Sequence, residues 1–254
     1  MNEAQVKTRG RRARRGEGRT AEPGQNAHLK VPFITRQIPT YDILSEESLD
    51  QIEATAERIM AEIGIEFRED PEVVELFRAA GAKVTDLTAD SWNLKFEPGL
   101  IRKILSTAPE RFTQHARNPA NSVEIGGDAL VLAPSYGSPF VMDLDKGRRY
   151  GTIADFENFV KLAQMSPNLH HSGGTICEPT DIAVNKRHLD MVYAHMRYSD
   201  RAFLGSITAP ERAEDSIEMC RILFGADFVD QNCVIMGNFN TTSPMVMDGV
   251  TTQG

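Results

Sequence analysis

The alternation of apolar strands and amphipathic helices after residue 128 is the feature that most constrains the fold of this chain. Short apolar runs predict four strands, at 129–133, 169–174, 202–208 and 233–239. Predicted helices separate these strands, in units of about 30–35 residues. Such repeats build an α/β fold with a parallel sheet, and units of this length suit a (β/α)8 barrel of roughly 250 residues.

The number of strand–helix units that fit into the chain allows only part of a barrel. Residues 128–254 hold about four units, which is half of the required number. A four-stranded half barrel would leave two parallel edge strands and half of its apolar face exposed. An open α/β sheet is one alternative, and a chain that is cut short is the other. We favour the second, and we expect the N-terminal half of a TIM (β/α)8 barrel.

Local signals support the elements between these strands. Alternating residues on both sides of Asp145-Lys146-Gly147 predict a hairpin over 140–150. Thr152 with Asp155 three residues later is a capping box that predicts the start of a helix. Two further helices are expected at 184–198 and at 210–225.

The segment before the repeats lacks their rhythm. Capping signals predict three helices there, at 45–64, 70–81 and 98–105. Short strands are expected near 65–67 and 112–116. We therefore expect residues 31–127 to form an α+β cap region that precedes the half barrel.

The first 30 residues differ from the rest in charge. They carry eight Lys and Arg against three Glu, whereas the whole chain has a net charge of −8. They contain almost no large apolar residue, so we expect residues 1–30 to be a disordered basic tail. A solvated tail is the favoured interpretation, and an arm that binds nucleic acid is the alternative. No apolar segment follows the arginines, which argues against a secretory signal.

Several functional classes lack support in the sequence. No run of about 18 apolar residues predicts a transmembrane helix. Three cysteines without a CxxC pair argue against a disulfide scaffold and fit a reducing cytoplasm. His170-His171 with Cys177 is the nearest approach to a metal site. Adjacent residues of a strand face opposite sides, so we expect hydrogen-bonded histidines there and no metal.

Polar side chains follow each predicted parallel strand, at the edge where barrel active sites lie, the barrel mouth. We expect four residues to line this mouth, and two more in second place; in that order they are Tyr136, Glu178, Asn238 and Asn240, then Ser135 and Thr208. The face of an aromatic ring such as Tyr136 or Phe140 attracts an alkylammonium group. Amide side chains orient small polar ligands, and a partly buried Glu178 could face a cation. No catalytic residue is assigned.

Four segments resemble one family in order and spacing. They lie at 44–82, 131–159, 188–191 and 205–224, and PFVMDLDKGRRYGT and GSITAPERAEDSIEM are the most specific stretches. With them the chain resembles the trimethylamine methyltransferase family over nearly all of residues 40–245. The resemblance implies a TIM barrel that moves a methyl group from a methylated amine to the cobalt of a partner corrinoid protein. Members that use trimethylamine carry pyrrolysine late in the barrel, and relatives without it act on quaternary amines such as glycine betaine.

This resemblance sets the expected cofactor and partners. The cobalt is carried by the corrinoid protein, so this chain is expected to bind no cofactor directly. The expected ligand is a small methylated amine, and a homo-oligomer is expected for the full-length protein. Family chains are longer, so we expect a fragment that lacks the pyrrolysine region. Two alternatives stay open: a barrel that binds a quaternary amine without transferring methyl, and a protein whose basic tail binds nucleic acid.

Overall fold

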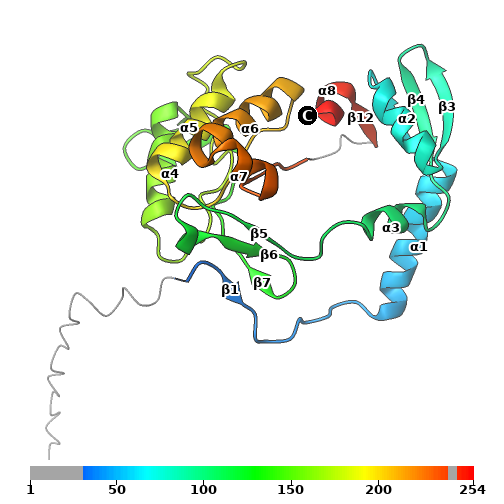
Figure 1. Cartoon of the computed structure of the whole chain (residues 1–254), viewed down its shortest axis with the longest axis horizontal. Helices are drawn as coiled ribbons and strands as arrows, with labels where there is room; N and C mark the ends of the chain where they lie inside the picture. Colours follow the sequence, from blue (N-terminus) through cyan, green and yellow to red (C-terminus); the bar gives the residue numbers. More distant parts are fainter. Residues whose placement is uncertain (1–30, 240–244) are drawn as a thin grey trace, which may run out of the picture. The chain divides into compact units, whose positions relative to one another are not determined.

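The computed structural model describes residues 31–239 and 245–254 (Figure 1). The predicted basic tail at 1–30 and the predicted site residue Asn240 lie outside the described residues. The described part is mixed α/β and contains no closed barrel. Among its helices, none is long and apolar enough to cross a membrane.

The three predicted helices of the cap region are confirmed, and side-chain caps set the starts of the first two. Helix α1 (Glu46–Glu62) follows Ser45, whose side chain accepts a hydrogen bond from the Ser48 backbone N–H. Helix α2 (Pro71–Ala80) follows Asp70, which caps the Val73 N–H, and it ends at Gly81 with φ at +108°. Only glycine adopts that φ at no cost. Helix α3 (Leu100–Leu105) is the short third helix.

A four-stranded sheet packs against these helices. Its strands are β2 (Ile65–Arg68), β3 (Lys83–Thr88), β4 (Ser91–Lys95) and β12 (Val246–Asp248), in the order β12-β2-β4-β3. Strand β12 pairs parallel to β2, and the other pairs are antiparallel. The core under the sheet centres on Phe67, Val74, Leu94 and Phe96. The sequence predicted β2 but gave no signal for its pairing with β12, which comes from the far end of the chain.

The predicted buried strand at 129–133 is wrong. The structure has a two-residue strand, β7 (Ala129–Leu130), which pairs antiparallel with β1 (Ile34–Thr35). Leu130 and Leu132 are exposed. Arg36 holds this pairing, because its backbone N–H and its guanidinium both bond to Asp128, at 2.8 and 3.0 Å. The apolar run therefore belongs to a two-stranded antiparallel pair whose leucines stay exposed, and not to a buried parallel sheet.

The segments after β7 follow one another in sequence order. Strands β10 (Phe203–Leu204) and β11 (Ile235–Met236) pair in parallel, as predicted. The predicted strand at 169–174 is not regular, because Gly173 has a φ of +93°. Its backbone still bonds to both neighbours: the His170 N–H donates to Leu132 O, and the Ser172 N–H donates to Ala202 O, both at 2.8 Å. This order is the one expected of a half barrel, which remains a prediction.

Helices α4 (Ile153–Met165), α5 (Arg187–Tyr198) and α6 (Pro210–Phe224) lie side by side and cover these segments (Figure 1). The predicted inner face of α4 is confirmed, since Phe156, Val160 and Ala163 are buried. Helix α7 (Ala226–Gln231) and helix α8 (Gly249–Gln253) complete the described helices of more than one turn.

The predicted hairpin and capping box are confirmed together. Strands β8 (Phe140–Asp143) and β9 (Gly147–Tyr150) form the hairpin. Both terminal nitrogens of Arg149 from β9 donate hydrogen bonds to the Asp155 carboxylate, at 2.5 and 2.7 Å. Asp155 also accepts from the Thr152 N–H, so the hairpin is fixed to the first turn of α4. Hydrogen bonding to Arg149 holds the pKa of Asp155 well below its usual range.

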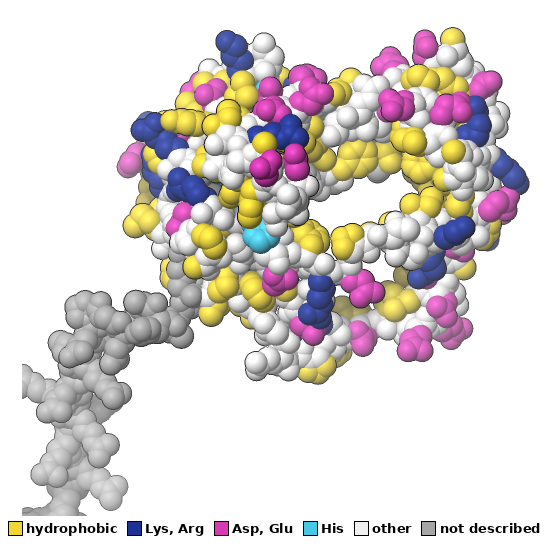
Figure 2. Space-filling view, in the orientation of Figure 1, with side chains coloured by type: hydrophobic (Ala, Val, Ile, Leu, Met, Phe, Trp, Pro, Cys, Tyr) yellow, Lys and Arg dark blue, Asp and Glu magenta, His cyan; other side chains and the backbone are white. Residues whose placement is uncertain are grey.

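The remaining strands are short and pair near the chain's middle. Strand β5 (Phe112–Gln114) is antiparallel to β6 (Val123–Ile125), and a 3-10 turn, η2 (Pro119–Asn121), lies between them. Large apolar side chains remain on the surface, coloured yellow in Figure 2. Those of Ile38, Tyr41 and Ile43 are exposed by 75%, 90% and 85%. Helix α1 likewise buries no residue completely, so the start of the described chain adds little to the core.

We predict that Thr152→Ala lowers the free energy of unfolding by about 1 kcal/mol, because one N–H of the first turn of α4 loses its acceptor. Urea denaturation measures the loss. Asn158→Ala is the control, because Asn158 is an exposed residue of the same helix. A change at Asn158 as large and of the same sign would show that the effect does not come from the cap.

Candidate functional site

The ends of the four successive segments meet at one edge of the structure. The Gly137 N–H donates to Thr175 O at 2.7 Å, and Ser138 forms a parallel bridge with Cys177. The segments that follow β10 and β11 also lie side by side. A Cβ added at Gly237 would come within 2.5 Å of the Ile207 side chain, so the two segments approach each other closely there. The polar residues predicted for this edge are therefore near one another along the backbone.

Tyr136 and Asn238 are brought together directly. They are 102 positions apart, and Asn238 Nδ2 donates a hydrogen bond to Tyr136 Oη. Tyr136 comes from the segment after the first predicted strand, and Asn238 from the segment after the fourth. The Tyr136 ring is 50% exposed, so a ligand can still reach it.

Glu178 is placed at the same edge, but its charge is balanced. Its carboxylate accepts a hydrogen bond from Arg187 at 2.7 Å. Its backbone N–H donates to Ser138 O at 2.9 Å. Arg187 is the first residue of α5. The sequence suggested that Glu178 faces a ligand cation, and it did not predict that a cation of the protein itself pairs with Glu178. Removing Glu178 would leave a partly buried guanidinium without its carboxylate.

Thr208 and Ser135 have different surroundings. Thr208 Oγ1 accepts a hydrogen bond from Arg212 at 2.7 Å and lies 3.4 Å from Ser206 Oγ. Ser135 is exposed beside Tyr136. Sequence reasoning missed both arginines. The available signal was that Arg187 and Arg212 each lie in the first turn of a helix that follows a predicted strand.

Phe140 does not present a free aromatic face. The Arg148 guanidinium carbon lies 3.7 Å from the centre of its ring, and the Tyr150 ring centre is 4.8 Å away. A protein cation thus already occupies the position that we considered for an alkylammonium group. Tyr136 is then the remaining aromatic candidate of the two that the sequence suggested.

The adjacent histidines belong to a buried hydrogen-bonded network, as expected. His171 accepts from the Gly173 N–H at 2.9 Å through Nδ1, so its Nε2 carries the proton and donates to Gln114 at 3.1 Å. Gln114 in turn donates to Phe203 O of β10 at 2.8 Å. His170 instead accepts from the Leu132 N–H at 3.0 Å. Among the described residues, no group of three His, Cys, Asp or Glu side chains could hold a metal ion.

A third imidazole strengthens this network. His195 of α5 donates from Nε2 to Gly174 O at 2.9 Å and accepts from Ser172 Oγ at 2.7 Å. Burial lowers the pKa of His195 to about 4. Burial, with the nearby His195 as a second cause, lowers the pKa of His171 to about 4. Both rings are therefore neutral at physiological pH and hold structure rather than move protons.

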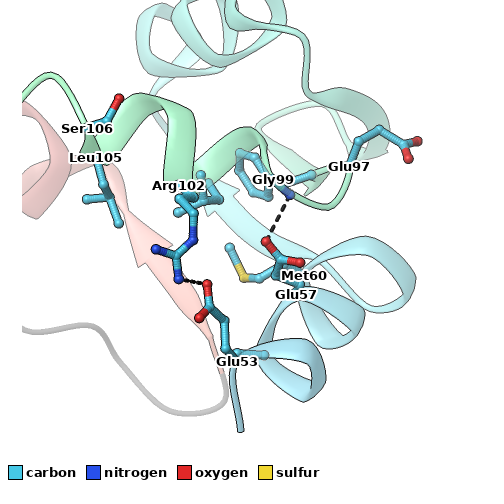
Figure 3. Close-up of a pocket in the computed structure, with 11 residues that line it drawn as sticks. Glu53, Glu57, Met60, Glu97, Gly99, Arg102, Leu105 and Ser106 are labelled. Atoms are coloured by element: carbon cyan, nitrogen blue, oxygen red, sulfur yellow. Dashed lines mark hydrogen bonds and ion pairs between the residues drawn. The ribbon is translucent and has the colours of Figure 1, made fainter. Parts of the chain in front are cut away.

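A cavity of about 440 Å³ lies away from this edge, between α1 and α3 (Figure 3). Its apolar lining includes Met60, Phe96 and Leu105. Figure 3 shows the Glu53 and Glu57 carboxylates directed at Arg102 and at the Gly99 N–H, with which they bond. Its size is that of a ligand site, but these polar groups already satisfy one another. We therefore place the candidate site at the strand ends.

Comparison with known proteins supplies independent information. Residues 7–254 match the model of a family described as trimethylamine methyltransferase (MTTB). The glycine betaine methyltransferase of Desulfitobacterium hafniense (strain Y51) is 43% identical over 212 residues, which make up 83% of this chain. The same residues are 43% of that protein, so the chain spans less than half the length of this curated relative.

The buried histidines generate a prediction about acid stability. Their pKa values fall from 6.5 in the unfolded chain to about 4 in the folded one. Their contribution is therefore complete above about pH 6.5 and is lost as the pH falls towards 4. Each histidine accounts for about 3 kcal/mol of this loss. We expect urea denaturation of the His171→Gln variant to show a smaller decline over this window than the unmodified protein, although its stability at neutral pH is lower.

His115→Gln is the control, because the His115 ring packs edge-on against Phe228 outside the buried network. It should leave the decline between pH 6.5 and 4 unchanged. An equal decline in the His171→Gln variant and the unmodified protein would contradict the assignment of this acid sensitivity to His171.

Proposed function

The chain belongs to the trimethylamine methyltransferase family, and from this premise we propose that it contributes to methyl transfer from a quaternary amine of the glycine betaine type to a corrinoid protein. Support for the family reaction comes from the match over residues 7–254. Support for a quaternary amine comes from the 43% identity to a protein named glycine betaine methyltransferase. The observation in the structure that carries the proposal is the Tyr136–Asn238 pair at the strand ends.

Methyl transfer from a quaternary amine requires little proton transfer by the side chains of the site. The cobalt of the partner's corrinoid supplies the nucleophile when that protein docks. A quaternary amine already carries a positive charge, so it leaves as a neutral amine without being protonated first. The protein must hold the ammonium group, exclude water from it and orient one methyl group outward. Aromatic and amide side chains perform these tasks.

Tyr136 supplies the surface for the cation. An ammonium group on the face of its ring gains about 0.5–1 kcal/mol at an exposed site and about 2 kcal/mol when it is desolvated. The hydrogen bond from Asn238 restrains the ring through its hydroxyl, so the ring face is held in one orientation. Asn238 is thus a positioning residue for Tyr136.

Arg212 suits the other end of a betaine. Glycine betaine is a zwitterion, so its carboxylate needs a cationic or hydrogen-bonding partner, whereas trimethylamine needs none. Strands β10 and β11 pair in register up to Leu204 and Met236, and Thr208 and Asn238 lie on the segments that follow these two strands. Thr208 holds the Arg212 guanidinium. A guanidinium held at the end of the segment that follows β10 favours a carboxylated amine as substrate.

A protein that binds a quaternary amine without transferring methyl is the alternative. The same pair of residues would serve it, so binding alone does not distinguish the two functions. Incubation with glycine betaine and a corrinoid protein in the cobalt(I) state distinguishes them. We expect the cobalt(I) absorbance to disappear. Measurable betaine binding with unchanged absorbance would favour the non-catalytic alternative.

We predict that Tyr136→Ala weakens glycine betaine binding about 5- to 30-fold, the equivalent of about 1–2 kcal/mol, because the aromatic face is lost. Tyr136→Phe keeps the ring and should keep most of the affinity. Isothermal titration calorimetry measures both. Tyr193→Ala is the matched control, because Tyr193 is 51% exposed and its hydroxyl also accepts a hydrogen bond, from Arg197. Equal losses in the Tyr136→Ala and Tyr193→Ala variants would remove Tyr136 from the site.

A further inference from the structure

One buried histidine has a nitrogen without a partner. The His188 side chain is 4% exposed, and its Nε2 lies 2.8 Å from Asp215 Oδ2 of α6. Its other nitrogen, Nδ1, is buried and makes no hydrogen bond to any described residue. His188 lies in the first turn of α5 and has no part in the His171–His195 network or in the Tyr136–Asn238 pair.

The Asp215 contact decides where the proton of the His188 ring lies. An ionised carboxylate only accepts hydrogen bonds, so His188 Nε2 carries the hydrogen that it donates. In the neutral ring, Nδ1 then holds a lone pair. Leaving such an acceptor buried and unsatisfied costs about 1–3 kcal/mol, and buried polar groups without a protein partner commonly bind an ordered water.

A small cavity lies beside this ring. Its volume is about 10 Å³, which is at the threshold for holding a single water molecule. His188 lines it together with Gly174 and Thr175, at the end of the second predicted strand, and Gly205 and Ser206, which follow β10. The lining also includes the apolar Met191, Val192 and Leu204, so its polar side is formed by His188, backbone groups and the hydroxyl side chains of Thr175 and Ser206. A buried water needs two to four polar partners.

We propose that this cavity binds one ordered water molecule, which donates a hydrogen bond to His188 Nδ1 and connects it to the end of β10. The connected groups are then Asp215, His188, the water and Ser206, whose hydroxyl lies 3.4 Å from Thr208. This series of hydrogen bonds links the half-exposed carboxylate of Asp215 on α6 to the edge that holds the candidate site. It makes His188 a positioning residue for the Gly205–Ser206 turn, whichever amine binds there.

A crystal structure at about 1.5 Å resolution tests the proposal directly, because ordered waters are visible there. We expect one water oxygen at hydrogen-bond distance, about 2.7–3.2 Å, from His188 Nδ1. A dry cavity, or a protein donor at that distance from Nδ1, would overturn the proposal. Nitrogen-15 NMR of the ring at mildly alkaline pH supplies a signature that packing alone does not fix. Nε2 should carry the proton, and a protonated Nδ1 would overturn the proposal as well.

Variants separate the His188 nitrogen from the shape of its ring. In the His188→Phe variant the ring remains but the acceptor is gone, so the water should disappear from the cavity. Water that persists there would mean that His188 does not bind it. If His188→Phe fails to fold, Asp215→Ala provides the test, since it removes the acceptor of the Nε2 proton. That proton should then exchange faster with solvent, whereas Glu214→Ala, a change at the exposed neighbouring residue, should leave its exchange unaltered. Equal exchange in these two variants would contradict the role of Asp215.

Discussion

The neutral imidazoles at the second predicted strand are the constraint on which the rest of the parallel region depends. Gly173, with its φ of +93°, interrupts the strand, so a regular ladder does not hold this segment between its neighbours. Side-chain hydrogen bonds add to the few backbone bonds that His170 and Ser172 make to the neighbouring segments. His171 connects the segment through Gln114 to β10, and His195 connects it to α5. A buried polar network of this kind stabilises only when every member is satisfied, and the assigned protons satisfy both rings.

The charged side chains at the candidate site, like the buried histidines, have partners within the protein. Glu178 is paired with Arg187, and Arg212 bonds to Thr208. A paired carboxylate attracts a second cation less strongly than a free one, because the arginine already offsets its field. The exposed aromatic face of Tyr136 attracts a cation without that competition. Binding of an ammonium group at this edge would therefore rest on ring faces and amide dipoles, and Arg212, which bonds to an uncharged side chain, would serve an anionic end of the ligand.

Local signals predicted the helices, and non-local pairing explains most of what they missed. Ser45, Asp70 and Thr152 fix helix ends through bonds to residues three positions away, so the sequence alone reveals them. The apolar run at 129–133 was wrongly predicted as a buried strand, because local signals do not reveal its partner β1, which lies almost a hundred residues earlier. The Tyr136–Asn238 contact shows what position can predict. Strand order placed both residues at one edge, but it could not supply the partners of Glu178 and Thr208, which come from helix faces.

The four-stranded sheet ties the two predicted regions together, because β12 belongs to the sequence after residue 128 and β2 to the sequence before it. Asp70 reinforces the connection. One oxygen of its carboxylate caps α2, and the other accepts a hydrogen bond from Thr252 of α8 at 2.6 Å. The carboxylate is buried, so the loss of either partner would leave an acceptor oxygen away from water. The same side chain that starts a helix of the cap region therefore also anchors α8, which comes from the far end of the chain.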